Sequence, residues 1–299
     1  MSDVAPVPER YVPEQHGISP IAYEHWHRYY HAKGFSRDKV VVDVACGEGY
    51  GSRLLSGVAS SVTGIDIDSG TIGRAKQKYS APNLTFIVGS VTSIPLEAAV
   101  ADVVVSFETI EHISASDQKM MFDEVRRILK PEGIFLVSTP NLTSRFFAEG
   151  QNKFHQKEFS HSEFVEFCSE RFKHVRIMGQ NLIVGSLIAT EDDWRDSRGN
   201  LEIVNVRFAA TPEQHPATAA DAKFTIAACS DGEPAKTFGS LLLDTDLALF
   251  DEFENYAASL RASIVEMETH GKFLVAELER KKAEAASSVD APGQPGNAV

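Results

Sequence analysis

A run of valines that leads into a cluster of glycines is the feature that most constrains how this 299-residue chain can fold. Residues 40–51 read Val-Val-Val-Asp-Val-Ala-Cys-Gly-Glu-Gly-Tyr-Gly. The valines predict a buried strand, and Gly47, Gly49 and Gly51 predict a tight turn that opens a helix. Glycine lets a ligand approach the backbone closely, and a helix N-terminus offers unpaired N–H groups. The stretch therefore has the outline of a nucleotide-binding turn.

The spacing of these glycines differs from the dinucleotide fingerprint, because a third glycine three residues after the second is missing. A second strand is predicted over residues 62–66, and it ends in Asp66, 19 residues beyond Gly47. An acid at this separation binds ribose hydroxyls in α/β nucleotide folds. Asp66 could instead cap the next helix or lie in a surface turn, but its position at a strand end favours the ribose role.

Strands and helices alternate along the rest of the first 230 residues. The patterns predict helices over residues 50–60, 70–79, 117–129 and 162–168, a helical or irregular piece over 93–99, and strands over 84–89, 101–107, 134–138, 174–178 and 224–228. The last strand is expected to pair antiparallel. We therefore predict an α/β fold: a Rossmann-like, doubly wound, mostly parallel seven-stranded sheet that binds ligands at the carboxyl ends of its strands.

An N-terminal helix is predicted over residues 20–32, with Ser19 as its N-cap and Pro20 at its first position. It follows an extended, proline-rich arm over residues 1–19. The helix is rich in tyrosine, tryptophan and histidine and has almost no aliphatic face. Two interpretations stay open: the helix docks on the domain edge through its rings while its histidines are solvated, or it forms a lid over a ligand.

A heptad pattern begins near Leu241. Apolar residues recur seven apart, with a second set interleaved: Leu243, Phe250, Ala257 and Ile264, then Leu247, Phe253, Leu260 and Met267. The pattern predicts a helix to about Glu279, interrupted at Gly271, that either packs on its own domain or joins subunits as a coiled coil. The persistence of the seam favours the coiled coil and a homo-oligomer. The predicted divisions are an arm and lid over 1–37, a main domain over 38–232, a helical tail over 233–284 and disorder over 285–299, with an irregular stretch over 190–218 that has strand character at 201–208.

Charge and cysteine usage limit the possible partners. The net charge is −13 and the pI is about 5.2, which disfavours nucleic acid as the main partner. Cys46, Cys168 and Cys229 are far apart and lack metal-ligand spacing, as is typical of reduced thiols in the cytosol. No apolar run is long enough to span a bilayer. We expect a cytoplasmic protein, with a peripheral location at the inner membrane face as an alternative.

Four sequence blocks, in order, resemble the class I S-adenosylmethionine-dependent methyltransferases: residues 41–49, 64–66, 102–106 and 126–133. The resemblance covers roughly residues 38–232. It implies that Asp43, Ala45, Gly47 and Gly49 surround the methionine part of S-adenosylmethionine and that Asp66 takes its ribose hydroxyls. Further cofactor contacts are implied at Cys46, Ile67, Ser90, Val91 and Phe107. Many relatives carry an acid for the adenine amino group where this chain has Ser90.

A second block, residues 107–112, places acids and an imidazole after the fourth strand. In a helix, Glu108, Glu111 and His112 would share one face and could hold a divalent cation or supply a general base. Alternatively, the acids cap a helix start and line the substrate pocket. The block resembles the metal site of ubiquinone-type catechol O-methyltransferases and small-RNA 2′-O-methyltransferases. That resemblance implies His155 as a further ligand, His161 as a second choice, and Mg²⁺ or Mn²⁺ as the ion. The candidate catalytic residues are His112 or His155 as the base, together with Glu111.

The acceptor is predicted from a further resemblance. Residues 9–13, 23–29 and 152–160, together with the heptad tail, look like methyltransferases of bacterial surface-polysaccharide (O-antigen or capsule) assembly. This implies O-methylation of a glycan, at a sugar hydroxyl or a terminal group in chain capping, by an oligomer that meets a multimeric glycosyltransferase. Two alternatives remain. One is a methyltransferase acting on a nucleotide-sugar or a quinol-like phenol, and the other is a non-catalytic scaffold that only positions its coiled coil.

Overall fold

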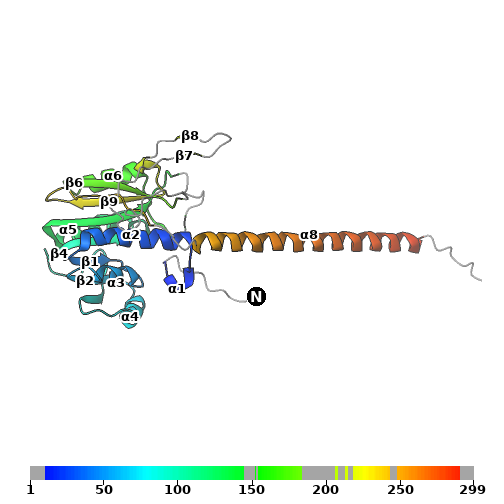
Figure 1. Ribbon diagram of the computed structural model, residues 1–299, viewed down its shortest axis with the longest axis horizontal. Helices are drawn as coiled ribbons and strands as arrows, with labels where there is room; N and C mark the ends of the chain where they lie inside the picture. The colour runs from blue at the N-terminus through cyan, green and yellow to red at the C-terminus, as the bar shows by residue number, and fades with distance from the viewer. Residues whose placement is uncertain are drawn as a thin grey trace, which may run out of the picture. The chain divides into compact units, whose positions relative to one another are not determined.

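The computed structural model describes residues 11–144, 152, 154–183, 206–207, 213–214, 218–242 and 248–289. The chain divides into two compact units, Met1–Leu242 and Leu243–Val299. The first unit contains a central sheet with its covering helices, and the second contains one long helix (Figure 1).

A seven-stranded sheet with the order β3-β2-β1-β4-β5-β9-β6 forms the centre of the first unit. The strands β1 to β5 run parallel, and β9 runs antiparallel to both of its neighbours. Their bounds are β1 Val40–Val44, β2 Ser61–Asp66, β3 Leu84–Val88, β4 Ala101–Phe107, β5 Leu129–Pro140, β6 His174–Gln180 and β9 Phe224–Ser230. The predicted doubly wound, mostly parallel sheet is confirmed. Its strand order reverses between β1 and β4, which is where such sheets bind ligands.

Helices cover both faces of this sheet. They are α2 Pro20–Ser36, α3 Tyr50–Ser56, α4 Ser69–Lys78, α5 Ala115–Ile128 and α6 His161–Ser169. Val41 and Val103 belong to the core cluster that contains residues of α2 and α3, whereas Val42 and Val104 belong to the cluster of α5 and α6. Successive side chains of a strand point to opposite faces, so a run of valines buries both.

Some element boundaries differ from the predictions. The strand β5 begins at Leu129, directly after α5 and five residues before the predicted start at residue 134. Of the two alternatives for residues 93–99, the structure has the irregular one, with an isolated bridge between Ser90 and Ser93. The helix α3 ends at Ser56, four residues early, because the chain turns at Gly57.

The N-terminal segment packs through its rings. A short helix, α1 Pro13–His16, replaces part of the expected extended arm. The ring of Tyr11 stacks on His25 at 4.8 Å, and Trp26 and Tyr29 meet the ring of Tyr50 edge-on at 5.1 and 5.4 Å. His25 Nδ1 lies 2.8 Å from the Tyr50 hydroxyl oxygen, and burial, followed by nearby Arg28, lowers its pKa well below the usual range. The helix α2 is therefore docked by its rings, and the expectation of solvated histidines is wrong for His25.

The second unit consists of α8, a 42-residue helix over Ala248–Val289. It begins seven residues after Leu241 and continues past Glu279, into the stretch predicted to be disordered from residue 285. Within the irregular stretch over 190–218, the structure describes two short paired strands, β7 Val206–Arg207 and β8 Glu213–Gln214. The other residues of the predicted strand at 201–208 lie outside the described residues. None of the described helices has the length and apolar character needed to cross a bilayer.

Candidate active site

The turn after β1 has a left-handed backbone. Ala45, Gly47 and Gly49 have φ angles of 61°, 55° and 81°. A Cβ added to Gly49 would also lie 2.7 Å from the ring of Phe86. Glycine is therefore required at residue 49 by both the backbone conformation and the packing. The helix α3 begins at the next residue, Tyr50, so its N-terminal N–H groups border the turn.

Asp66 contacts the turn from the end of β2. One of its carboxylate oxygens accepts a hydrogen bond from Gly47 N at 3.0 Å, and the other accepts one from Asp68 N at 3.0 Å. The strands β1 and β2 are parallel neighbours, so their carboxyl ends meet at one edge of the sheet. The fold thus brings together Gly47 and Asp66, two residues that the sequence predicted to bind the cofactor.

Asp43 is buried beneath the same turn. Its carboxylate accepts hydrogen bonds from Ser52 Oγ at 2.6 Å and from the Tyr29 hydroxyl at 3.1 and 3.3 Å. Burial raises the pKa of Asp43 to about 7, while the two hydroxyl groups oppose this rise. Asp43 therefore ties β1 to α2 and α3. Its contact with the methionine part of a cofactor stays a prediction.

The other predicted cofactor residues lie around this edge or beneath it. Ile67 follows Asp66 and is 71% exposed, while Ser90 and Val91 follow β3, the parallel neighbour of β2. Ser90 Oγ lies 2.8 Å from Thr92 Oγ1. Cys46 and Phe107 are buried: burial raises the pKa of the Cys46 thiol, and the ring of Phe107 packs edge-on against Tyr29 at 5.2 Å. The buried pair can contact a cofactor through the backbone.

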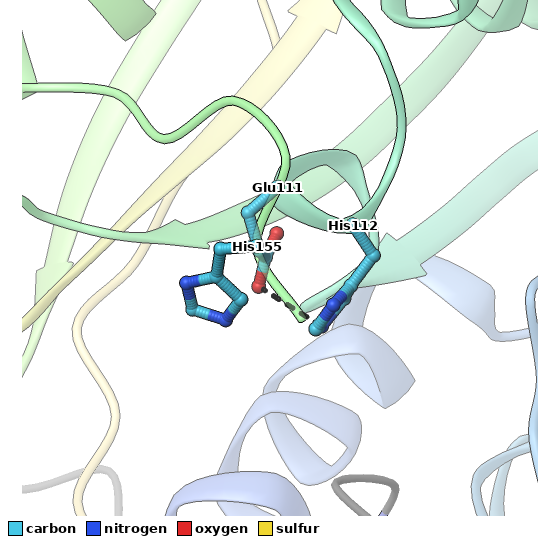
Figure 2. Close-up of side chains that lie close together, drawn as sticks. All are labelled: Glu111, His112 and His155. Atoms are coloured by element: carbon cyan, nitrogen blue, oxygen red, sulfur yellow. Dashed lines mark ion pairs between the residues drawn. The ribbon is translucent and has the colours of Figure 1, made fainter. Parts of the chain in front are cut away.

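Glu111, His112 and His155 form a compact group. The first two follow β4, and His155 follows β5. A carboxylate oxygen of Glu111 and a ring nitrogen of each histidine all lie within 4.8 Å of one another. Figure 2 shows the three side chains converging, with the ion pair between Glu111 Oε1 and His112 Nε2 at 3.9 Å. Burial, followed by the nearby charge of Glu108, raises the pKa of Glu111 well above its usual range.

The loop that carries His155 is fixed to the short 3₁₀ helix Ile110–His112 by hydrogen bonds. Gln156 N donates to Glu111 O at 2.8 Å, and Gln118 Nε2 donates to both Ile110 O and Lys157 O, at 2.8 and 2.9 Å. His155 Nδ1 is also paired with Glu158. These contacts hold together two segments that lie more than 40 residues apart in the sequence.

The predicted shared helical face of Glu108, Glu111 and His112 is wrong. Glu108 has a φ of 52°, so the chain cannot continue as a helix from residue 107, and the 3₁₀ helix begins at Ile110. The carboxylate of Glu108 accepts a hydrogen bond from Ser138 Oγ at 2.6 Å and is outside the metal-competent group. His161 is also outside this group, with its Nδ1 3.2 Å from Thr225 Oγ1.

Arg28 and Tyr29 are the residues near the site that the sequence analysis missed. Arg28 is 1% exposed and donates from Nη1 to Gln180 Oε1 at 2.7 Å, with Glu108 Oε1 at 3.9 Å and the Phe224 ring centroid at 4.8 Å. A lone arginine in an aromatic helix was the available signal. Gln180 and Phe224 come from strands more than 150 residues later, and Glu108 follows 80 residues later, so spacing could not identify them.

Comparison with known proteins finds methyltransferases that are similar to part of this chain. Residues 42–137 match the family model described as a methyltransferase domain. The chain is 39% identical over 130 residues to a probable S-adenosylmethionine-dependent methyltransferase of Mycolicibacterium smegmatis, which covers 42% of this chain and 48% of that protein. It is 31% identical over 116 residues to a ubiquinone biosynthesis O-methyltransferase of Haemophilus ducreyi, which covers 36% and 48%. The chain thus spans about half the length of these curated relatives.

Among solved structures, the protein bound to the Trm112 methyltransferase activator of Haloferax volcanii aligns with a TM-score of 0.51 and 21% identity. The alignment covers 75% of this chain and 97% of that chain, and at this identity it shows the fold alone. Residues 42–137 thus match a methyltransferase domain, and the first unit has a Rossmann-like fold.

Proposed function

We propose that this chain is an S-adenosylmethionine-dependent methyltransferase that methylates a hydroxyl oxygen. The observation that carries the proposal is the pairing of the glycine turn with Asp66, whose carboxylate lies 3.0 Å from Gly47 N. A left-handed turn admits a ligand close to the backbone, and a buried carboxylate beside it accepts hydrogen bonds from ligand hydroxyls. The 39% identity to a probable methyltransferase of this type supports the same cofactor.

The group Glu111, His112 and His155 supports transfer to oxygen. In this reaction the acceptor oxygen forms a bond to the methyl carbon as the carbon–sulfur bond breaks, and the acceptor hydroxyl gives up its proton. Of the two histidines, the His112 side chain is the more exposed, so it is the one placed to take that proton. Glu111 on one side and the Glu158-paired His155 on the other orient the imidazole.

A divalent cation is a second use of the same group. One carboxylate and two imidazoles within 4.8 Å are donors that suit Mn²⁺ better than Mg²⁺, which prefers oxygen ligands. Glu158 beside His155 is the kind of carboxylate partner that metal-binding histidines commonly have. Glu111, His112 and His155 would hold the ion, which when bound lowers the pKa of a coordinated hydroxyl.

For the acceptor we propose a sugar hydroxyl of a glycan, including a surface polysaccharide and its terminal groups. Aromatic rings provide apolar faces on which sugars stack. Phe154 is 45% exposed, and its backbone carbonyl oxygen lies 3.3 Å from Nδ1 of His112, the proposed base. Tyr30 of α2 is 48% exposed. Because Tyr29 and Trp26 are packed against Tyr50, the exposed aromatic surface is smaller than the composition of α2 indicates.

A quinol-like phenol is the second candidate acceptor. The 31% identity to a ubiquinone biosynthesis O-methyltransferase favours it. A phenol ionises near pH 10 and loses its proton more easily than a sugar hydroxyl, so it depends less on a general base. Transfer of a labelled methyl group to neutral or acidic oligosaccharides, compared with transfer to a catechol, separates the two candidates. Labelling of the catechol alone would reject the glycan.

Binding of S-adenosylhomocysteine tests the cofactor assignment. We expect wild-type protein to bind it in isothermal titration calorimetry and Asp66→Asn to weaken binding by roughly tenfold or more, because lost hydrogen bonds to a carboxylate cost about 1.5–3 kcal/mol. Asp68→Asn is the matched control, since the Asp68 side chain caps α4 and its backbone N–H donates to Asp66. No binding by wild-type protein would favour the non-catalytic scaffold.

Substitution of the proposed base tests the acceptor chemistry. His112→Ala is expected to lower kcat by roughly 10²–10⁴-fold, the usual contribution of a general base. His161→Ala should retain activity, because His161 contacts Thr225 outside the group. Loss of activity with a chelator, restored by Mn²⁺, would support the cation, whereas full activity of both His112→Ala and the chelated enzyme would reject both roles.

A further inference from the structure

The guanidinium of Arg28 is buried with incomplete hydrogen bonding. Nη1 donates to Gln180 Oε1, but Nε and Nη2 have no hydrogen-bond partner among the described residues. A buried donor without an acceptor destabilises a folded protein, so such groups are rare and call for a physical explanation. The acid one turn earlier on α2, Glu24, is bonded through Oε1 to Lys223 Nζ at 2.6 Å and is not a hydrogen-bond partner of these two atoms.

The two unpartnered atoms form one edge of the guanidinium, and this edge suits a carboxylate or a phosphate. In the same chain, Nε and Nη2 of Arg74 donate to Glu48 at 3.2 and 2.7 Å. The corresponding edge of Arg126 donates to a single oxygen of Asp231, at 3.1 and 2.9 Å, whereas the bonds of Arg74 reach both oxygens of Glu48 in parallel. Such parallel hydrogen bonds match the spacing of the oxygens of an anion. The Nε and Nη2 atoms of Arg28 form the same kind of edge, and both are buried.

The contacts of Arg28 place its guanidinium beside β9, β6 and the end of β4. Phe224 and Gln180 belong to β9 and β6. Glu108, 3.9 Å from Arg28 Nη1, follows β4 and lies three residues before Glu111. The guanidinium therefore lies near the chain segment that carries the proposed base.

Resting on the methyl transfer proposed above, we propose that Arg28 binds an anionic group of the acceptor through its Nε and Nη2 atoms. The acceptor is then an acidic molecule, such as a sugar acid or a sugar phosphate, whose carboxylate or phosphate is fixed by Arg28. Its hydroxyl is presented to His112. Arg28 acts in this way as a specificity residue, because a neutral acceptor would leave the buried guanidinium edge unpaired.

The variant Arg28→Lys tests this proposal, because lysine keeps the charge and removes the two-donor edge. The matched control is Arg126→Lys, which changes the same kind of edge at an ion pair with Asp231 whose two side chains are both accessible to solvent. Thermal unfolding is measured with saturating S-adenosylhomocysteine and increasing glucuronate, inorganic phosphate or glucose. We expect glucuronate and phosphate to stabilise the wild-type protein more than glucose does, and Arg28→Lys to weaken the apparent affinity for both anions at least fivefold.

Calorimetry with S-adenosylhomocysteine distinguishes the source of the anion. Affinity unchanged within twofold in Arg28→Lys supports the acceptor, whereas a tenfold loss assigns Arg28 to the carboxylate of the cofactor and overturns the proposal. Equal anion affinities in both proteins would also overturn it. If Arg28→Lys does not fold, the wild-type comparison decides, since equal effects of glucuronate and glucose contradict the proposal. Failure of the wild-type protein to bind S-adenosylhomocysteine would instead refute the proposed function.

An independent observation concerns α8, whose heptad seam continues beyond Gly271. The seam residues with large apolar side chains are 45–67% exposed: Phe250, Phe253, Leu260, Ile264, Met267, Leu274 and Leu278. A stripe with the 3.5-residue repeat sustained over four heptads is the pattern by which two helices pack as a coiled coil. The seam accordingly requires a partner helix of the same kind.

We infer that the partner is α8 of a second copy of this chain, parallel and in register. In that arrangement the residue directly before the first seam position of each heptad (position g) faces the residue five positions later (position e) in the other copy. Glu277 then faces Lys282, and the pairs Tyr256–Arg261, Ser263–Glu268 and His270–Val275 bring no like charges together. Self-pairing thus satisfies the apolar seam and gains one attractive charge pair on each side.

Light scattering coupled to size-exclusion chromatography tests the self-association. We expect wild-type protein to have at least twice the chain mass of 32.8 kDa. Leu260→Asp places a charge in the seam and should give the monomer mass. The control Val265→Asp changes a residue that is 61% exposed and off the seam, and it should retain the wild-type mass. A monomeric wild-type protein, or the same effect of both substitutions, would overturn the inference.

Discussion

At the residue scale, Asp43 shows how burial changes the chemistry of a predicted cofactor residue. Ser52 and Tyr29 donate hydrogen bonds to its carboxylate, yet burial raises its pKa to about 7. The unfolded chain has an ordinary aspartate pKa near 3.9, so the folded protein holds this proton more tightly. The stabilisation from this proton is therefore complete below about pH 4 and is lost as the pH rises through about 7.

Asp43→Asn is expected to remove this part of the pH dependence of stability. Between pH 4.5 and 7.5, the free energy of unfolding of the wild-type protein should fall relative to that of the variant, because only wild-type protein loses the buried proton. Urea unfolding at several pH values measures the difference. The exposed Asp123→Asn provides the control, and a wild-type slope in Asp43→Asn would contradict the pKa assignment.

At the element scale, two helical glycines differ in what surrounds them. Gly73 of α4 has no heavy atom within 4 Å of the position of an added Cβ, whereas a Cβ on Gly34 of α2 would overlap the ring of Phe238. We expect Gly73→Ala to stabilise the protein by about 0.5–1 kcal/mol and Gly34→Ala to destabilise it by about 1–3 kcal/mol. Urea unfolding checks both, and equal effects would contradict the packing around α2.

The elements with strong periodicity were predictable from the sequence, and the short irregular ones were not. The strand β4 has the predicted bounds, and α5 begins two residues before its predicted start. The valines of β4 and the amphipathic repeat of α5 are both local signals. The shared face of Glu108, Glu111 and His112 depended on a helix that includes residue 108. A single left-handed residue, Glu108, changed it, and no local pattern identifies a non-glycine residue that adopts this conformation.

At the scale of the whole molecule, the two compact units divide at Leu242. All residues of the three buried core clusters lie before this point. The first unit also includes residues 233–242, which the sequence analysis assigned to the helical tail. We expect a chain of residues 1–242 to fold, to bind S-adenosylhomocysteine within about twofold of the full chain, and to be monomeric. Calorimetry and light scattering measure these properties. An unfolded truncated chain would show that the helical unit is needed for folding.

The sequence by itself determined the class of this fold, the glycine turn, the acid at the end of β2 and the seam of α8. These features depend on residues close together in the chain, whose spacing reflects the geometry of one strand, turn or helix. Only the tertiary structure decided that Arg28 meets Gln180, that His155 joins Glu111 and His112, and that Tyr29 donates to Asp43. Those contacts depend on the order of strands in the sheet, because strand order places distant segments side by side.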